Sequence, residues 1–308
     1  MAKYLLKRLV EAIGVIFCIS LITFFVLNIV PGNPVEIMLG EFADQATIAR
    51  VTHEMGLDQP IHIQYISWLT NMLKGDFGMS YFQNRPVIEI LTTSFLVTAK
   101  LAGIAYILAV VLGVVVGVIA AVNRGKWLDS TLMTISVIGI SAPSFWIAII
   151  LQIIVCLKFN LLPLSGIDSF KSFILPGIAL GIRYAASIAR ITRTSMLDVL
   201  SQDYIRTAQA KGLKGWVVIL KHALRNALIP IITIAGADLG SILTGSVLVE
   251  SVFSIPGIGK MLVDSINTRD LPIVQGGVMY IAVICVVMYL VVDMLYTVVD
   301  PRIRLGKE

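Results

Sequence analysis

Six long apolar stretches constrain the fold of this 308-residue chain more than any other feature. They cover residues 9–30, 99–122, 131–157, 173–192, 228–249 and 274–298. Each can cross the hydrocarbon core of a bilayer as a helix, which takes about 20 apolar residues. Only 14% of the residues are charged, against about 25% in a soluble domain. The sequence therefore predicts an all-α, polytopic membrane protein with six transmembrane helices.

The basic residues are distributed unevenly between the loops. Of the 24 Lys and Arg residues, 15 lie in the N-terminus, the loop with Arg124 and Lys126, the segment 190–225 and the C-terminal tail. Loops rich in Lys and Arg stay in the cytoplasm, so both termini are predicted to be cytoplasmic. The net charge of +5 then reflects topology, and it gives no reason to expect a nucleic acid partner.

The predicted spans divide the chain into four parts. Residues 1–30 form the N-terminus and first span, residues 31–97 an external region, residues 98–298 the core bundle of five spans, and residues 299–308 a cytoplasmic tail. In the external region, Ile61, Tyr65, Trp68 and Leu69 recur at helical spacing. This pattern predicts a short amphipathic helix near the membrane face, with Trp68 as an interfacial anchor. The helix either packs over the bundle or contacts a partner.

The core bundle contains a cytoplasmic segment, residues 193–227, that is too polar to cross the membrane. It includes the sequence DYIRTAQAKGLKGWVVILKHALRNALIP. Asp203 is a candidate N-cap, and Gly212 and Gly215 are candidate helix stops. The segment is therefore predicted to form a short helix, a turn and a second basic helix. Such a basic loop either fixes topology or docks another protein.

The motifs of self-contained enzymes are absent from the sequence. There is no phosphate-binding loop, zinc-protease motif, nucleophile elbow or C-x-x-C pair. The three cysteines, Cys18, Cys156 and Cys285, lie in different apolar stretches, which argues against a metal site or a disulfide framework. We therefore predict no catalytic residue, no metal site and no cofactor in this chain, so any ATP must bind another chain.

Two ionisable residues lie deep in the predicted spans. Arg183 and Asp238 are each about ten residues into a stretch, which at 1.5 Å per residue places both near the bilayer midplane. Charges at this depth are costly and usually functional. They either pair with each other or line a pathway for a charged substrate.

Small residues mark a close helix contact in the second span. They recur every four residues, at Ala105, Ala109, Gly113, Gly117 and Ala121. Such a stripe lets another helix approach closely, but it does not say whether that helix belongs to the same chain. Pro143 and Pro176 predict kinks in the third and fourth spans.

The cytoplasmic string, DYIRTAQAKGL followed by KHALRNALIP, resembles the signature of permease subunits of ABC importers. The similarity is to the B-type subunit of the oligopeptide, dipeptide and nickel family. It spans nearly the whole chain through VPGNPV, GLDQPIHIQY, GDFGMS, ARITRTSM, ESVFSIPGIG and DPRIR. Arg206 and Thr207 depart from the general importer pattern, in which an acidic residue and two alanines precede the glycine.

The resemblance implies the type I ABC importer permease fold and a multi-chain complex in the plasma (inner) membrane of a prokaryote. The partners would be a second related permease subunit, two ATPases that hold ATP and Mg, and an external solute-binding protein. The helix from Tyr204 to Lys211 would be the coupling helix. Its predicted contacts to the ATPase are Tyr204, Ile205, Arg206, Thr207, Ala208, Lys211 and Gly212.

The expected substrates are dipeptides or oligopeptides, with nickel and glutathione as alternatives in the same family. Selectivity in such systems lies largely with the binding protein, which is another chain. A stand-alone secondary transporter is an alternative of a different class, but such proteins commonly show internal repeats, and none is visible here. A structural membrane anchor would need neither kinked spans nor midplane charges.

Overall fold

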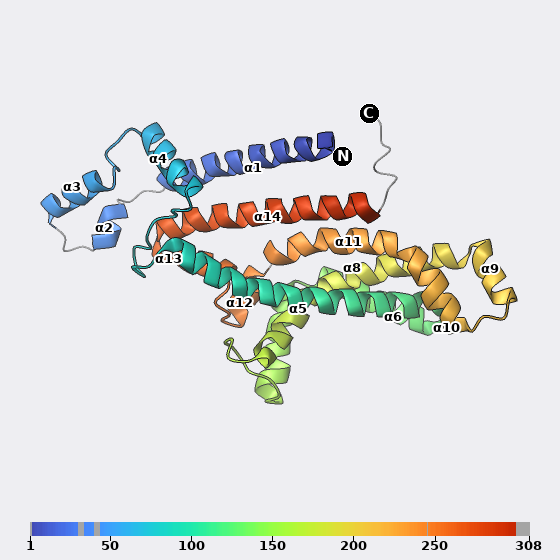
Figure 1. The fold of residues 1–308 in the computed structure, drawn as a ribbon. Coiled ribbons are helices and arrows are strands. Elements are labelled where there is room, and N and C mark those ends of the chain that lie inside the picture. Colours follow the sequence, from blue (N-terminus) through green and yellow to red (C-terminus); the bar gives the residue numbers. More distant parts are fainter. Residues whose placement is uncertain (1, 30–33, 40–43, 245, 300–308) are drawn as a thin grey trace. The chain divides into compact units, whose positions relative to one another are not determined.

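The computed structural model describes residues 2–29, 34–39, 44–244 and 246–299. Within this part of the chain every regular element is a helix, and a single isolated β-bridge joins Met79 and Pro86 (Figure 1). The predicted all-α class is confirmed. Residues 30–33 of the VPGNPV motif, the DPRIR motif and the predicted tail beyond residue 299 lie outside the described residues.

Apolar helices long enough to cross a membrane form most of the described chain. Five of them contain all or most of α1 (Ala2–Ile29), α5 (Val87–Val122), α8 (Ile174–Leu200), α11 (Arg225–Thr244) and α14 (Leu271–Val299). A sixth candidate span consists of α6 (Trp127–Ser141) followed by α7 (Ser144–Leu151) and η1 (Gln152–Lys158). Its two halves are bent by 106° at the break between them.

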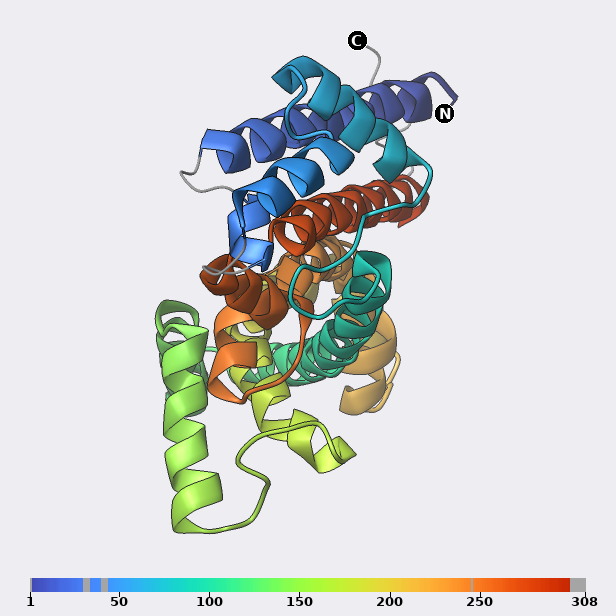
Figure 2. The ribbon, with the colours of Figure 1, turned by 90° about the vertical axis from the view of Figure 1, so that its left-hand side faces the viewer.

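The two prolines that predict kinks behave differently. Ala142 has extended backbone angles directly before Pro143, because a proline ring disfavours the α conformation of the preceding residue. The segment of α7 and η1 therefore leaves the direction of α6 (Figures 1 and 2). Pro176 instead lies in the first turn of α8. A missing N–H there removes no helical hydrogen bond, so α8 continues to Leu200.

The chain divides into two compact units. The first contains residues 1–97 and 257–287, and the second contains residues 98–256 and 288–308. The structure thus groups residues 257–287 with the predicted external region, whereas the sequence predicts them to be part of the core bundle.

The first unit contains α1, the beginnings of α5 and α14, and four shorter helices. These are α2 (Pro34–Leu39), α3 (Gln45–Glu54), α4 (Ile61–Leu73) and α13 (Ile258–Thr268). Helix α4 is the amphipathic helix that the sequence predicts, and its apolar face packs on α1. The Phe24 ring lies 5.3 Å from Tyr65 and 5.5 Å from Trp68, and the hydroxyls of Ser20 and Tyr65 are 2.8 Å apart. Trp68 is therefore a packing residue between two helices of the chain.

The second unit is built around α8, which packs against α6, α7 and α11. Its shorter helices are η2 (Phe170–Phe173), α9 (Asp203–Ala210), α10 (Gly215–Val217), η3 (Val218–Leu224) and α12 (Val247–Val252). The small-residue stripe of α5 meets α8, because a Cβ added at Gly113 would lie 2.7 Å from the carbonyl oxygen of Ala185. The helix that the stripe accommodates therefore belongs to the same chain.

Candidate functional site

The predicted coupling helix is α9, which begins at Asp203 and ends at Ala210. Its N-cap is Gln202, with no side-chain cap, so the prediction of Asp203 as N-cap is wrong by one residue. Asp203 instead places its carboxylate in the first turn, where the helix dipole favours a negative charge. Gly212 follows the helix with φ of +74°, a left-handed conformation that glycine adopts without steric cost.

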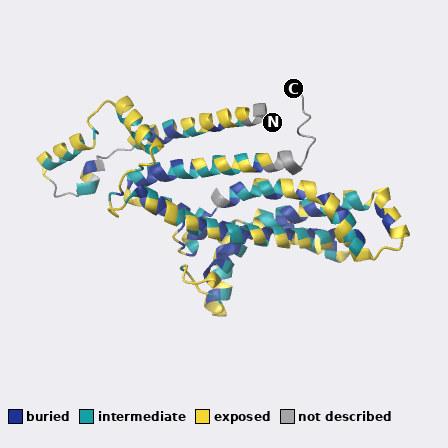
Figure 3. Cartoon of the chain, in the orientation of Figure 1, coloured by how far each residue is buried: buried dark blue, intermediate teal, exposed yellow. Residues whose placement is uncertain are grey.

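Helix α9 has a buried face and an exposed face (Figure 3). Ile205 and Ala208 are only 1% and 7% exposed, and they belong to the same apolar cluster as Val218 and Ala223 of η3. The remaining residues of the predicted contact set are exposed: Tyr204, Arg206, Thr207, Lys211 and Gly212. Only these five can touch a docked protein without rearrangement, whereas Ile205 and Ala208 attach the helix to its own chain.

The position of α9 connects it to two apolar helices. It follows α8 after one short turn, in which the N–H of Gln202 donates to the carbonyl oxygen of Val199 at 3.1 Å. It also packs against η3, which leads directly into α11. A force applied to the exposed face of α9 therefore reaches both α8 and α11.

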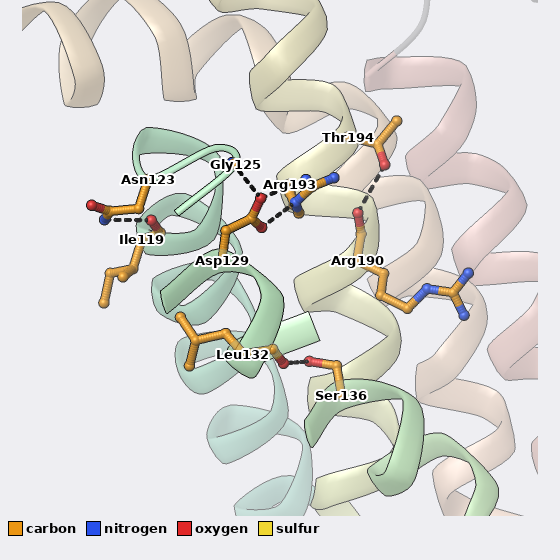
Figure 4. A network of polar contacts seen from close by, with 9 residues as sticks. All are labelled: Ile119, Asn123, Gly125, Asp129, Leu132, Ser136, Arg190, Arg193 and Thr194. Carbon is orange, nitrogen blue, oxygen red and sulfur yellow. Dashed lines mark hydrogen bonds and ion pairs between the residues drawn. The ribbon is translucent and has the colours of Figure 1, made fainter. Parts of the chain in front are cut away.

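A buried ion pair joins α6 to α8 in the second unit (Figure 4). Arg193 donates to Asp129 through two nitrogens, with Nε–Oδ1 at 2.6 Å and Nη2–Oδ2 at 2.8 Å. The N–H of Gly125 donates to the same carboxylate at 3.1 Å. The side chains are 6% and 27% exposed for Asp129 and Arg193, respectively. This bidentate geometry is the strong form of an Arg–carboxylate contact.

Sequence reasoning missed this pair. Arg193 lies within the ARITRTSM motif, where it counted only as one of several topology-determining cations. The available signal was Asp129 itself, an acidic residue beside a basic loop and directly before an apolar stretch. Oppositely charged residues at the ends of two apolar stretches can face each other when the two helices are neighbours.

Arg183 and Asp238 lie on the adjacent helices α8 and α11. No ion pair of 4.0 Å or less joins them, Arg183 is exposed, and the buried Oδ2 atom of Asp238 has no hydrogen-bond partner within the described chain. The structure does not bring the two charged groups into contact, and their direct pairing stays a prediction. An exposed Arg in an apolar span needs a wet pathway or a partner helix, because lipid would penalise it.

A second buried carboxylate lies in the ESVFSIPGIG motif. Glu250 is fully buried and accepts hydrogen bonds from Thr98 Oγ1 at 2.6 Å and from Ser246 Oγ at 2.8 Å. The contact with Thr98 ties α12 to α5 within the second unit. In the sequence Glu250 is notable only as part of a family motif, because a glutamate beside a predicted loop ordinarily points to water.

Comparison with known proteins identifies the protein family to which this chain belongs. Residues 113–305 match the family described as "Binding-protein-dependent transport system inner membrane component", and residues 1–102 match its N-terminal companion family. The chain is 42% identical over 304 residues to the glutathione transport system permease protein GsiC of Salmonella choleraesuis (strain SC-B67), and 41% identical to that of Escherichia coli (strain K12). Each alignment covers 99% of both chains.

The fold is also found in a solved structure. The MetNI methionine ABC transporter in an inward-facing conformation superposes with a TM-score of 0.56 at 17% sequence identity, over 69% of this chain and 97% of that chain. The chain is therefore a helical, multi-span subunit of a membrane transport system. It belongs to the family of ABC importer permeases, in its peptide and nickel branch. It is a permease and not itself an enzyme, since the ATPase of such a transporter is a separate chain.

Proposed function

We propose that this permease forms the membrane pathway of an importer for short peptides, together with a second related permease subunit. Glutathione, itself a tripeptide, is the first substrate to test. Two ATPase chains would bind ATP and Mg on the cytoplasmic side, and an external solute-binding protein would deliver the substrate. Both chain termini would face the cytoplasm. The observation that carries the proposal is the full-length similarity to permeases of glutathione transport systems.

The exposed face of α9 supports the proposed ATPase contact. Closure of the ATPases on ATP would push this face, and the apolar contacts of Ile205 and Ala208 with η3 would transmit the displacement as a rigid-body movement. Helices α8 and α11 would then move together and alternate the access of the pathway between the two sides of the membrane.

The intramembrane charges support a zwitterionic or anionic peptide better than a metal ion. Arg183 can meet a substrate carboxylate, and Asp238 can meet an ammonium group. Nickel favours imidazole ligands, whereas His53, His62 and His222 all lie outside the six apolar stretches. We therefore place Arg183 and Asp238 on the pathway as substrate-facing residues.

The test of the substrate class uses the whole complex in liposomes, with its ATPases and its binding protein. We expect ATP-dependent uptake of glutathione or of short peptides, and stimulation of ATP hydrolysis by the same compounds. Uptake of Ni²⁺ without uptake of any peptide would contradict the proposal. So would a permease that repeatedly purifies without an ATPase subunit in several mild detergents.

Reversing a charge on α9 should uncouple transport from ATP hydrolysis. Arg206→Glu changes an exposed residue of the proposed interface, and like charges placed across an interface cost several kcal/mol. We expect peptide uptake to fall more than about tenfold while the complex still assembles. Lys126→Glu is the matched control, because Lys126 is also exposed but lies before α6. Equal uptake by both variants would remove α9 from the interface.

Exchanging the two intramembrane charges distinguishes pathway residues from a structural pair. Each of Arg183→Ala and Asp238→Ala should raise the KM for uptake. The exchanged variant, Arg183→Asp with Asp238→Arg, should restore nothing, because the structure forms no ion pair between these residues. Recovery of uptake in the exchanged variant would instead establish that they pair.

A further inference from the structure

A cavity of about 430 Å³ lies within the first unit. Its walls come from the end of α1, the end of α3 and the turn after it, α4, and the first turns of α14. Pockets for small ligands have volumes of about 300–1,000 Å³. The cavity contains none of the residues assigned to ATPase coupling or to the intramembrane charges, so it needs a separate explanation.

Side-chain amides are the commonest polar groups on the cavity wall. Two of them maintain the wall itself, because Gln64 Nε2 donates to the carbonyl oxygens of Leu57 and Gln59, and Asn28 Nδ2 donates to that of Phe24. Asn71 and Gln275 also line the cavity. A side-chain amide presents a donor and an acceptor together, which matches the N–H and C=O groups of a peptide backbone.

The charges around the cavity favour a cation. Glu54 lines it, and the described lining residues include no Lys or Arg. Glu54 has a neighbour in Arg50, but that contact is 3.9 Å long between exposed side chains, a geometry worth little. His53 brings no net positive charge, because its Nδ1 lies 2.6 Å from the carboxylate of Asp58. The hydrogen bond to Asp58 raises the pKa of His53, and the two charges compensate when the ring is protonated.

A second carboxylate lies behind the wall. Asp270 is 2% exposed and accepts hydrogen bonds from Ser80 Oγ at 2.5 Å and from the N–H of Tyr81 at 3.3 Å. Tyr81 itself lines the cavity. Burial and the nearby Asp270 raise the pKa of Tyr81 to about 12, so the phenol stays neutral. The phenol of Tyr81 therefore adds no charge to the cavity wall.

Apolar surface completes the cavity. Phe24 and Trp68 line it and are held by their mutual ring contact and by Tyr65. A rigid indole beside amides and a carboxylate suits a ligand with an apolar side chain next to an ammonium group.

We propose that this cavity binds the amino-terminal end of a short peptide. Glu54 would attract the α-ammonium group, Asn71 and Gln275 would hydrogen-bond the first peptide groups, and Trp68 would contact the first side chain. The inference rests on the proposed function, because it assumes a peptide importer. It adds a second peptide site, formed by the predicted external region and the ends of α1 and α14, that is separate from Arg183 and Asp238.

The test measures equilibrium binding of radiolabelled trialanine to the full transporter complex in nanodiscs, without the solute-binding protein. We expect saturable binding, for which unlabelled trialanine competes and N-acetyl-trialanine competes up to about fivefold less well, since the loss of an exposed charge contact costs at most about that factor. Glu54→Gln and Asn71→Leu should each weaken binding by a similar factor. The controls Asp44→Asn and Thr70→Leu change exposed residues outside the lining and should bind as the unmodified complex does.

Two results would overturn the inference: equal competition by both peptides, or wild-type binding in Glu54→Gln and Asn71→Leu. Basal ATP hydrolysis and gel filtration of each variant show that it is folded and assembled. ATP-driven uptake with the binding protein, measured on the same preparations, separates the two proposals. Uptake of peptides by a complex that fails the binding test leaves the proposed function intact and removes only the cavity site. If the unmodified complex takes up no peptide, the proposed function itself is contradicted.

Discussion

Replacing Gly117 by Val is expected to prevent stable packing of the second unit. A Cβ at this position would lie 2.4 Å from Cβ of Thr192 and 2.6 Å from the carbonyl oxygen of Ala189. The second of these atoms belongs to the backbone of α8, so it cannot move aside without displacing the helix. Overpacking a well-packed site costs about 1–3 kcal/mol and occasionally more. We expect a cost at the upper end, because both neighbours are buried.

Gly103→Val provides the matched control on the same helix. A Cβ at Gly103 meets nothing within 4 Å, and the substitution adds the same two methyl groups and the same β-branching. Thermal unfolding of the purified complex, followed by gel filtration, should show a large loss of stability for Gly117→Val and little for Gly103→Val. Equal melting temperatures would mean that α5 and α8 are not in close contact.

This contact shows what the sequence can and cannot predict about the fold. A repeat of small residues every four positions predicts a close helix contact, because only small side chains let two backbones approach. The repeat does not identify the partner helix, which the structure gives as α8. Similarly, Pro143 predicts a disturbance of the third span, but the size of the bend, 106°, depends on what the two halves pack against.

The coupling helix shows the same limit at the level of single residues. The family motif locates the helix to within one residue, since the prediction begins at Tyr204 and α9 at Asp203. Motif similarity does not assign faces, however, and it groups Ile205 and Ala208 with residues that reach the surface. Their burial comes from η3, whose arrangement beside α9 depends on the turn at Gly212. Substitutions such as Ala208→Glu would therefore damage the packing of the chain before they tested any contact with an ATPase.

The polar contacts between distant residues were the least predictable part of the site. Asp129 and Arg193 are 64 residues apart, and each has an ordinary explanation at the end of an apolar stretch. Thr98 and Glu250, which are 152 residues apart, give no sequence signal of pairing at all. Pairings of this kind follow from the arrangement of the helices, which a single sequence does not reveal.

Removing Arg193 should destabilise the junction of α6 and α8 and abolish most substrate uptake. The carboxylate of Asp129 is 6% exposed in the intact structure, and in Arg193→Ala it keeps only the N–H of Gly125 as a donor. Breaking a buried pair on one side costs about 3–5 kcal/mol, and partial exposure of Arg193 places the expected cost at the lower end. Uptake should fall as well, because α8 carries α9 at its end and would lose its ion pair with α6.

Three further variants separate the ion pair from a general effect of charge. Arg190→Ala removes an exposed cation of the same helix, one turn away and pointing away from Asp129 (Figure 4), and should melt close to the unmodified complex. Arg193→Lys keeps the charge but not the two-nitrogen geometry, so its stability should be intermediate. The double variant Asp129→Ala with Arg193→Ala should be more stable than Arg193→Ala alone, because it leaves no buried charge unpaired. If Arg193→Ala and Arg190→Ala had the same melting temperature, the pair would contribute no more to stability than an exposed charge on the same helix.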